Sequence, residues 1–366
     1  MNRRKFIVGA GGMAALAGAG LLGWRGATGS LDDYQAYAAA LRAPLPPDPV
    51  VAELIRFATL APNGHNTQPW RFAVSGQVVR LMPDLERRTP VVDPDDHHLY
   101  VSLGCAAETL AIAGRANGRP GAIDPAPGDG AALAFSFSAG APAADPLFDA
   151  IPRRQSTRGL FDGRPVPTAD LAALAAAGTM PGVRLVLLTE KARIAKARDL
   201  IVAANDRQMT DTAFMDELRR WIRFNPKAAM RSGDGLFSAA SGNPSVPDVI
   251  GDALFSMIVT AKGEGERYAR QLETTPLLAA FFAEQANPAH WMTIGRACQR
   301  FALTATTLGL KLAFVNQAVE VAAFRPALAE LAGESGLRPD LLLRIGYGAA
   351  LPYSPRRPVA AVMSAG

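Results

Sequence analysis

Residues 61–72 read Ala-Pro-Asn-Gly-His-Asn-Thr-Gln-Pro-Trp-Arg-Phe. The apolar run before this stretch predicts a helix that stops at Pro62, and a strand is expected at Trp70–Val74 after the polar loop. A hairpin to a second strand at Gln77–Met82 and a long helix at about Leu99–Asn117 follow. The length of 366 residues by itself allows two ordinary domains or one large α/β domain, with an ample core in either case.

A second series of elements repeats this order further along the chain. A helix and a strand are expected within residues 168–188, and an apolar helix that ends at a glycine comes later. Its outer glycines are Gly295 and Gly309. Gly104 and Gly118 of the first long helix have the same spacing, so the chain contains an internal repeat.

The repeat predicts two degenerate halves on one chain, residues 31–150 and 151–366. Residues 201–292 have no counterpart in the first half and are expected to be an insertion. Its centre, residues 231–248, is rich in glycine, proline and serine, which predicts an ordered but irregular loop of the kind that often forms a lid. The aromatic residues that the insertion brings are Trp221, Phe224 and Phe237.

The opening stretch resembles the Ala-Pro-Ser-x-x-Asn-x-Gln-Pro-Trp segment of the nitroreductase-like flavoproteins. In that family this loop hydrogen-bonds the polar rim of the FMN ring, whose donors and acceptors match backbone and side-chain amides. The resemblance implies an α+β fold, that of the FMN-dependent nitroreductases. The ring contacts that it implies are Pro62, Asn63, Gly64, His65, Asn66 and Gln68. From the residues alone, the alternative is a turn with an Asx motif.

Residues 153–161, Arg-Arg-Gln-Ser-Thr-Arg-Gly-Leu-Phe, resemble the family's Arg-Arg-Ser-x-Arg-x-Phe segment. The resemblance implies that Arg153, Arg154 and Ser156 bind the FMN phosphate, a dianion that needs several charge-assisted donors. Judged on charge alone, such an arginine pair is more often solvated surface.

Near the end of the chain, residues 341–348 resemble the family's closing strand. Arg356 and Arg357 then match its terminal phosphate-binding basic residue. The flanking prolines, Pro355 and Pro358, favour a fixed extended segment over the alternative of an exposed basic tail.

The two signatures are divided between the halves. The first half has the ring loop but no arginine segment before Pro49, whereas the second half has the arginines but only Met180-Pro181-Gly182 in place of the loop. One complete site is therefore expected, with one FMN per chain. This division resembles the Acg-like branch of the family, which implies a monomer that acts as a pseudo-dimer with a lid over the flavin.

The N-terminus predicts export. Residues 2–7 read Asn-Arg-Arg-Lys-Phe-Ile, and a weakly hydrophobic run follows at Val8–Trp24. This is the layout of a twin-arginine signal, so residues 1–30 are expected to engage the twin-arginine translocase. A transmembrane anchor is the alternative. The small-residue cleavage site at 27–29 is weak, so the protein is expected to be periplasmic, or tethered to the membrane if the signal is uncleaved.

Composition excludes several classes of site. The two cysteines, Cys105 and Cys298, form no Cys-x-x-Cys, so iron–sulfur clusters, covalent haem and structural zinc lack ligands. The acidic and histidine run at 93–98 precedes a helix, which favours N-terminal capping over a metal site. The net charge of +5 is spread along the chain, and no nucleic acid partner is expected. An organic cofactor remains.

Function follows from the resemblance. It implies an exported FMN oxidoreductase with an unidentified small-molecule electron donor and acceptor, and no catalytic residue is assigned. Export separates the protein from the NAD(P)H pool, so an FMN-sequestering or storage protein is the alternative. A serine hydrolase is disfavoured because no Gly-x-Ser-x-Gly elbow occurs.

Overall fold

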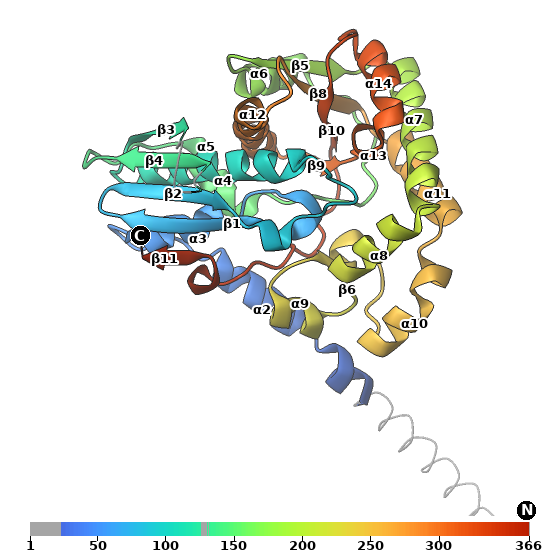
Figure 1. The fold of residues 1–366 in the computed structure, drawn as a ribbon, viewed down its shortest axis with the longest axis horizontal. Helices are drawn as coiled ribbons and strands as arrows, with labels where there is room; N and C mark the ends of the chain where they lie inside the picture. The colour runs from blue at the N-terminus through green and yellow to red at the C-terminus, as the bar shows by residue number, and fades with distance from the viewer. Residues whose placement is uncertain (1–22, 126–129, 131, 366) are drawn as a thin grey trace, which may run out of the picture.

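The computed structural model describes residues 23–125, 130 and 132–365 (Figure 1). The twin-arginine motif and most of the apolar run after it lie outside these residues. Within them, no helix has both the length and the apolar character needed to cross a membrane. The chain combines helices with two separate main sheets, so the expected α+β class is confirmed.

The first sheet contains the elements around the ring loop. Its strands are β1 (Trp70–Ser75), β2 (Val78–Pro83), β3 (Gly121–Pro125), β4 (Leu133–Phe137) and β11 (Met363–Ala365). Helices α3 (Val51–Ala58) and α4 (His97–Ala116) belong to the same half. The strand order is β11-β1-β2-β4-β3, and β11 pairs parallel with β1 while the other pairs are antiparallel. The C-terminus therefore returns to the first half (Figure 1).

The second sheet has the order β5-β8-β10-β9, and all its pairs are antiparallel. Its strands are β5 (Val183–Leu188), β8 (Leu277–Ala283), β9 (Lys311–Phe314) and β10 (Pro339–Gly346), with helices α6 (Thr168–Gly178) and α12 (Pro288–Thr307). In chain order this corresponds to β1-β2-β4-β3, with α12 at the position of α4. The two series are thus alike in topology as well as in sequence order.

Helices α4 and α12 pack against each other through reciprocal glycine contacts. A Cβ on Gly104 would lie 2.0 Å from the carbonyl oxygen of Met292, and a Cβ on Gly295 would lie 2.0 Å from that of Val101. Met292 precedes Gly295 by three residues, and Val101 precedes Gly104 by three. Such mutual contact is the pattern of a two-fold interface, here between two halves of one chain. Nearby, buried Glu108 of α4 pairs with Arg296 and Arg300 of α12 at 3.0 and 3.1 Å.

The insertion lies between β5 and β8, at residues 189–276, where the first half has only Gly76 and Gln77 between its strands. It contains α7 (Lys191–Met209), α8 (Thr212–Trp221), β6 (Ile222–Arg223), α9 (Pro226–Ser232), β7 (Leu236–Phe237), α10 (Asp248–Ile258) and α11 (Ala261–Glu273). The expected bounds of 201–292 are therefore displaced. The end is displaced because β8 is apolar and buried along its whole length, so it lacks the alternation that marks a half-exposed strand.

The remaining elements join these parts. They are α2 (Leu31–Leu41), α5 (Pro146–Ala150), α13 (Gln317–Glu320), α14 (Arg325–Ala332) and 3-10 turns at Gly64–Asn66, Leu85–Arg87, Ile151–Arg153, Ser238–Ser241, Ala322–Phe324 and Val359–Ala361. Helix α2 binds the C-terminal segment, because Tyr34 donates to the Tyr353 carbonyl at 2.6 Å and Tyr37 donates to that of Arg356 at 2.5 Å. The tyrosine Tyr34 also packs on Phe237 of the insertion.

Replacing Gly104 by Ala is expected to lower the free energy of unfolding by about 2 kcal/mol, because the added methyl group forces α4 away from the α12 backbone. Chemical denaturation measures this. Gly265→Ala is the matched control: this glycine is also buried in a helix, but its Cβ would meet neighbours at 3.5 Å. The control should be neutral or slightly stabilising. Equal effects of the two changes would contradict the close-packing argument.

Candidate functional site

The loop after α3 carries concentrated backbone strain. Five non-glycine residues among those described have positive φ, and three of them are His65 at 47°, Asn66 at 54° and Gln68 at 53°. Side chains rarely adopt this region without compensation. The Asn63 side chain compensates for part of this strain, since its Oδ1 accepts the backbone N–H of Gln68 at 2.8 Å. The polar loop predicted after Pro62 is therefore a rigid, strained turn.

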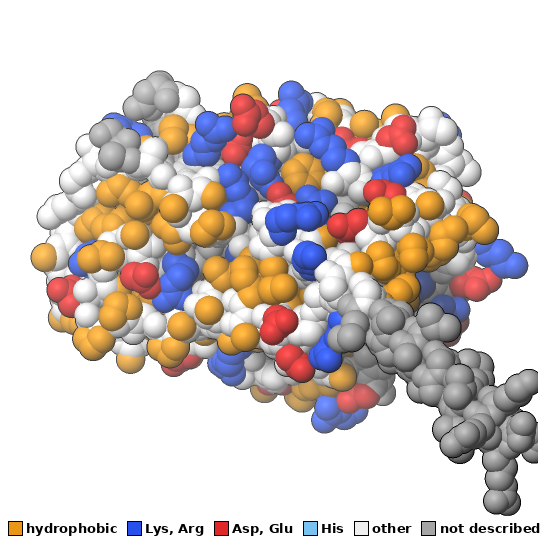
Figure 2. Space-filling view, turned by 90° about the horizontal axis from the view of Figure 1, so that it is seen from below, with side chains coloured by type: hydrophobic (Ala, Val, Ile, Leu, Met, Phe, Trp, Pro, Cys, Tyr) orange, Lys and Arg blue, Asp and Glu red, His pale blue; other side chains and the backbone are white. Residues whose placement is uncertain are grey.

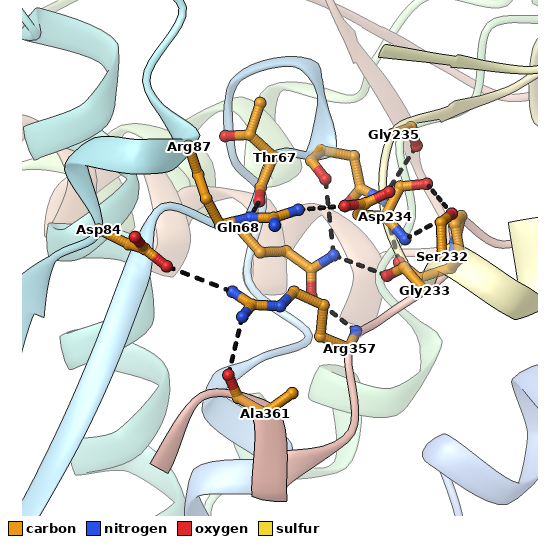
Figure 3. Close-up of polar contacts among 12 residues, drawn as sticks. Thr67, Gln68, Asp84, Arg87, Ser232, Gly233, Asp234, Gly235, Arg357 and Ala361 are labelled. Atoms are coloured by element: carbon orange, nitrogen blue, oxygen red, sulfur yellow. Dashed lines mark hydrogen bonds and ion pairs between the residues drawn. The ribbon is translucent and has the colours of Figure 1, made fainter. Parts of the chain in front are cut away.

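The insertion holds this loop from outside (Figure 3). The backbone of Gly235 donates to the Asn66 carbonyl at 3.0 Å, and Asn66 Nδ2 donates back to the Gly235 carbonyl at 3.0 Å. Gln68 Nε2 donates to the Gly233 carbonyl at 2.8 Å. Asp234 forms ion pairs with Arg87 and, at 2.6 Å, with Arg223. Residues 233–235 thus latch the insertion onto the loop, and we call this segment the latch.

A cavity of about 250 Å³ opens on the other side of the loop. Its walls come from the loop, from α4, from the segment around Ser156, and from the region of β9 and α13. Fourteen of its 31 lining residues belong to the insertion, so the insertion closes one whole side. The residues from the loop are Pro62, Asn63, Gly64 and His65, and those from α4 are His98, Val101, Ser102 and Cys105.

The aromatic residues Trp221, Phe224 and Phe237 of the insertion do not line this cavity. Trp221 packs under Arg87, and Phe237 stacks on Tyr34 with ring centroids 4.3 Å apart. Phe224 lies against Gly251. The apolar and aromatic wall comes instead from Phe214, Leu218 and Tyr268. Trp221 thus contacts the first half, Phe224 packs within the insertion and Phe237 packs on α2.

A smaller pocket adjoins the cavity and is rich in arginine. Pro62, Asn63, Ser156 and Arg158 line both spaces, and Arg42, Arg154 and Arg356 line the smaller one. Arg154 is 4% exposed, and only one of its nitrogens is bonded, to the Leu60 carbonyl at 3.1 Å. Its Nε and second terminal nitrogen have no partner. Because an unpaired buried guanidinium is costly, this pocket is built for an anion.

Two other arginines reinforce this property. The Arg158 side chain makes no hydrogen bond or ion pair with the described residues, and the Nε of Arg42 is buried without a partner. Burial lowers the pKa of Arg154 and of Arg158, and it lowers that of Arg42 to about 10. An anion bound between these groups would reverse that effect, since an opposite charge favours the protonated form.

The structure separates the predicted phosphate residues. Arg356 lines the small pocket, but its donors are used: it bonds the carbonyls of Thr59, Leu60, Ala61 and Pro355 and the Asn66 side chain at 2.6–3.1 Å. Arg356 therefore caps the end of α3. Arg357 turns away to Asp84 and the Ala361 carbonyl (Figure 3). Arg153 is exposed and bonds the Asp149 carbonyl. Of the expected set, Arg154, Ser156 and Arg356 line the pocket, and the Arg356 donors are already bonded.

The predicted ring residues divide in the same way. Pro62, Asn63, Gly64 and His65 line the cavity, whereas Gln68 is fully buried and bonds the latch and the backbone of Arg357. Asn66 borders the small pocket with its amide already bonded. Two further arginines line the small pocket. Arg158 belongs to the arginine segment at 153–161, whereas Arg42 precedes the repeat and no sequence motif marks it.

The run at 93–98 behaves as a helix cap. Both carboxylate oxygens of Asp93 accept backbone N–H groups, of His98 and Leu99, at 3.0 Å each. His97 Nε2 faces Asp340 at 2.8 Å, and burial lowers the pKa of His97 to about 3 and raises that of Asp340 to about 6. Ligand atoms of Asp93, His97 and His98 lie within 4.8 Å of one another, but the Asp93 oxygens are already engaged.

Titratable groups surround the inner end of the cavity. Burial raises the pKa of the Glu320 carboxyl, to which Gln208 donates at 2.6 Å, and it also raises that of Tyr268. Burial, with Arg158 nearby, lowers the pKa of His65 to about 4. His65 is therefore neutral near pH 7 and offers one donor and one acceptor nitrogen to whatever occupies the cavity.

Comparison with known proteins identifies relatives over nearly the whole chain. No family model matches. "Putative NAD(P)H nitroreductase Rv3131" of Mycobacterium tuberculosis is 29% identical over 348 residues, which cover 89% of this chain and 94% of the relative. "Putative NAD(P)H nitroreductase acg" of the same species is 23% identical over 326 residues, 85% of this chain and 94% of the relative. The resemblance predicted from the motifs, to nitroreductase-like proteins including an Acg protein, is confirmed.

Solved structures of similar shape have lower identity. The FMN-bound nitroreductase of Bacteroides fragilis is 16% identical and covers 56% of this chain and 90% of its own, with a TM-score of 0.36. The FMN-dependent nitroreductase NfnB of Mycobacterium smegmatis, in complex with NADPH, is 16% identical and covers 56% of this chain and 87% of its own, with a TM-score of 0.38.

Acidification from pH 6.5 to pH 4 is expected to destabilise the protein through His65. The unfolded chain binds this proton near pH 6.5, whereas the folded chain binds it only near pH 4. The free energy of unfolding therefore falls across this interval, by up to about 3 kcal/mol at 1.4 kcal/mol per pH unit. Urea unfolding of the wild type and of His65→Asn across this pH range measures the contribution of His65 to the free energy of unfolding. Asparagine is chosen because it tolerates positive φ. The variant should have the shallower pH dependence, and both should agree in slope above pH 7. Identical slopes below pH 6.5 would refute a buried neutral His65.

Proposed function

We propose that this chain, a homologue of the mycobacterial proteins named nitroreductases, is an FMN-dependent oxidoreductase with one FMN per chain. The observation that carries the proposal is the buried Arg154 guanidinium, which has two unpartnered nitrogens and lines a pocket that joins the larger cavity. A phosphate joined through a ribityl chain to a planar ring needs such a pair of spaces. The residues present therefore fit FMN.

The division of the spaces assigns roles to the residues. Arg154, Arg158, Arg42 and the Ser156 hydroxyl would hold the phosphate in the small pocket. The loop 62–65 would bind the polar edge of the ring through backbone groups and the Asn63 and His65 side chains. Bound FMN supplies hydride transfer at N5 of its ring.

The protein itself would position the FMN ring and enclose it. The strained loop is held on one side by Asn63 and on the other by the latch, so its donors are fixed before any ligand arrives. The insertion excludes water from the cavity with Phe214, Leu218 and Tyr268. The Glu320 carboxyl, whose pKa is raised by burial, and its donor Gln208 give the cavity wall a group that could exchange a proton with the occupant.

A single site per chain is supported by the asymmetry between the halves. At the position equivalent to the ring loop, the second half has Met180-Pro181-Gly182, which runs directly from α6 into β5. We propose that the chain is a single-chain pseudo-dimer, supported by the matched sheets and the reciprocal glycines. We also propose twin-arginine export, supported by residues 2–24, so that the electron donor is a small molecule outside the cytoplasmic NAD(P)H pool.

Replacing Arg154 by Gln is expected to weaken FMN binding by roughly tenfold to a hundredfold, because a charge-assisted hydrogen bond contributes about 1.5–3 kcal/mol. Riboflavin, which lacks the phosphate, should lose much less affinity. Fluorescence titration of the apoprotein with each flavin measures both constants.

The neighbouring arginine provides the matched control. Arg153→Gln is the same substitution at the neighbouring position, whose side chain is exposed. It should leave the affinities for FMN and riboflavin unchanged. An equal loss of FMN and riboflavin in Arg154→Gln would show that Arg154 does not contact the phosphate. Flavin quantified after denaturation should equal one per chain, and two would contradict the single-site proposal.

Breaking the latch is expected to speed FMN release. Asp234→Asn removes the charge that pairs with Arg87 and Arg223, leaving two partly buried arginines unpaired beside the loop. Stopped-flow transfer of FMN to an excess of a flavin-binding acceptor should show dissociation at least several times faster. Asp252→Asn is the control, since its pair with Arg219 is about half exposed and neither side chain bonds the loop. Unchanged release in Asp234→Asn would mean that the latch does not control the flavin.

A further inference from the structure

We propose that helix α10, Asp248–Ile258, docks on the surface of a lipid bilayer through its exposed apolar face. Eleven large apolar side chains of the described residues are exposed, and five of them belong to this one short helix. Val249 is 81% exposed, Met257 76% and Ile258 62%, and Ile250 and Leu254 complete the set. Isolated exposed apolar residues are ordinary, but a concentration of this kind marks a contact surface.

The exposed residues form one continuous face. Val249, Ala253 and Met257 are spaced by four, as are Ile250, Leu254 and Ile258, so the two rows lie side by side along the helix. The polar residues Asp248, Asp252 and Ser256 lie on a separate side. The helix is therefore amphipathic, with its apolar side directed to solvent. This is the arrangement of helices that lie in a membrane interface.

The helix is fixed in this orientation by the body of the protein. Phe255 is 2% exposed, and Gly251 packs so closely on Phe224 that a Cβ would lie 2.4 Å from its ring. Asn225 donates to the Asp248 side chain at 2.7 Å, and Arg219 pairs with Asp252 at 3.0 Å. Because the inner side of α10 is already packed against the body of the protein, rotation of the helix would not bury its outer apolar face.

The N-terminal segment enters the protein on the same side. The carbonyl of Gly26 accepts Lys227 Nζ of α9 at 2.8 Å, and Arg231 of α9 pairs with Asp248 at the start of α10 at 3.5 Å. Trp24 and Leu31 are exposed there, at 44% and 43%. Tryptophan is typical of membrane interfaces. In Figure 1 the first described helical turn and α10 both lie at the lower end of the molecule.

The chain before Gly23 identifies the occupant. The apolar run Val8–Trp24 follows Arg3, Arg4 and Lys5, and a segment of this composition brings the protein to a membrane. Figure 2 shows hydrophobic side chains in patches on the lower face of the body. The apolar face of α10 is thus close to the point at which the chain would meet the bilayer.

The charged groups around α10 are paired, so no unpaired carboxylate of the helix opposes docking. Asp248 and Asp252 pair with Arg231 and Arg219. Lys262, just beyond the helix, pairs with Glu266 at 4.0 Å, and the side chains of Lys262 and Arg231 are 89% and 72% exposed. Such exposed basic side chains beside an apolar face can reach anionic headgroups. Val259, one residue beyond the helix, lines the cavity, so docking would bring the bilayer close to the cavity wall.

The test uses the full chain mixed with vesicles of phosphatidylcholine and phosphatidylglycerol. An environment-sensitive fluorophore is attached at Met257→Cys, and at Val50→Cys as the control, which is 64% exposed on α3's side of the protein. The native cysteines are buried and should not be labelled. We expect the emission at position 257 to shift to the blue and to be quenched by nitroxide lipids, with no change at position 50.

A second comparison separates α10 from the N-terminal segment. Val249→Ser with Ile258→Ser in the labelled Met257→Cys chain should abolish the shift and the quenching, and Leu85→Ser should not. Thermal unfolding should be unaffected, because all these side chains are exposed. Solvent-like emission at position 257 with vesicles would overturn the proposal. So would a blue shift without lipid that grows with protein concentration alongside a dimer in sedimentation, since a second copy would then cover the face.

Discussion

The close crossing of α4 and α12 is the contact on which the rest of the structure depends. Gly104 and Gly295 allow each helix backbone to reach the carbonyl of the other, and no side chain could take their place without separating the helices. Cys105 of α4 donates to the Gly295 carbonyl at 3.1 Å, and the Glu108 cluster adds charged contacts nearby. Because the glycines are reciprocal, a single chain reproduces the geometry of a two-fold interface.

This crossing also brings together the parts of the candidate site. The strained loop follows α3 in the first half, and the Arg154 segment begins the second half, some ninety residues later along the chain. They meet only because the halves are packed on each other, and α4 supplies the wall between them. The insertion then closes the remaining side and is held by the latch. A change at the crossing would therefore alter the cavity, although neither Gly104 nor Gly295 lines it.

Competition for hydrogen bonds decides which arginines face the pocket. A guanidinium has five donors, and Arg356 uses them on four carbonyls and one amide, so it stabilises the end of α3. Arg154 shares the Leu60 carbonyl with Arg356 but keeps two nitrogens free. The structural arginine thus orders the loop, and the underused one beside it supplies charge to the pocket.

The sequence by itself determined what local residue chemistry encodes. A proline after an apolar run ends a helix, and a repeated glycine spacing marks equivalent helices, so the loop and the internal repeat could be predicted from residues 61–118 and 168–309. The resemblance of the loop to a known family then implied the α+β class. Only the tertiary structure decided the positions of Arg153, Arg356 and Arg357, the presence of Arg42 in the small pocket, and the end of the insertion at residue 276. Those outcomes depend on partners far away in the chain: Arg356 bonds Thr59, 297 residues earlier, and β8 could be recognised as a strand only when buried on both faces. Burial and donor satisfaction are properties of the packed molecule, and no local pattern carries them.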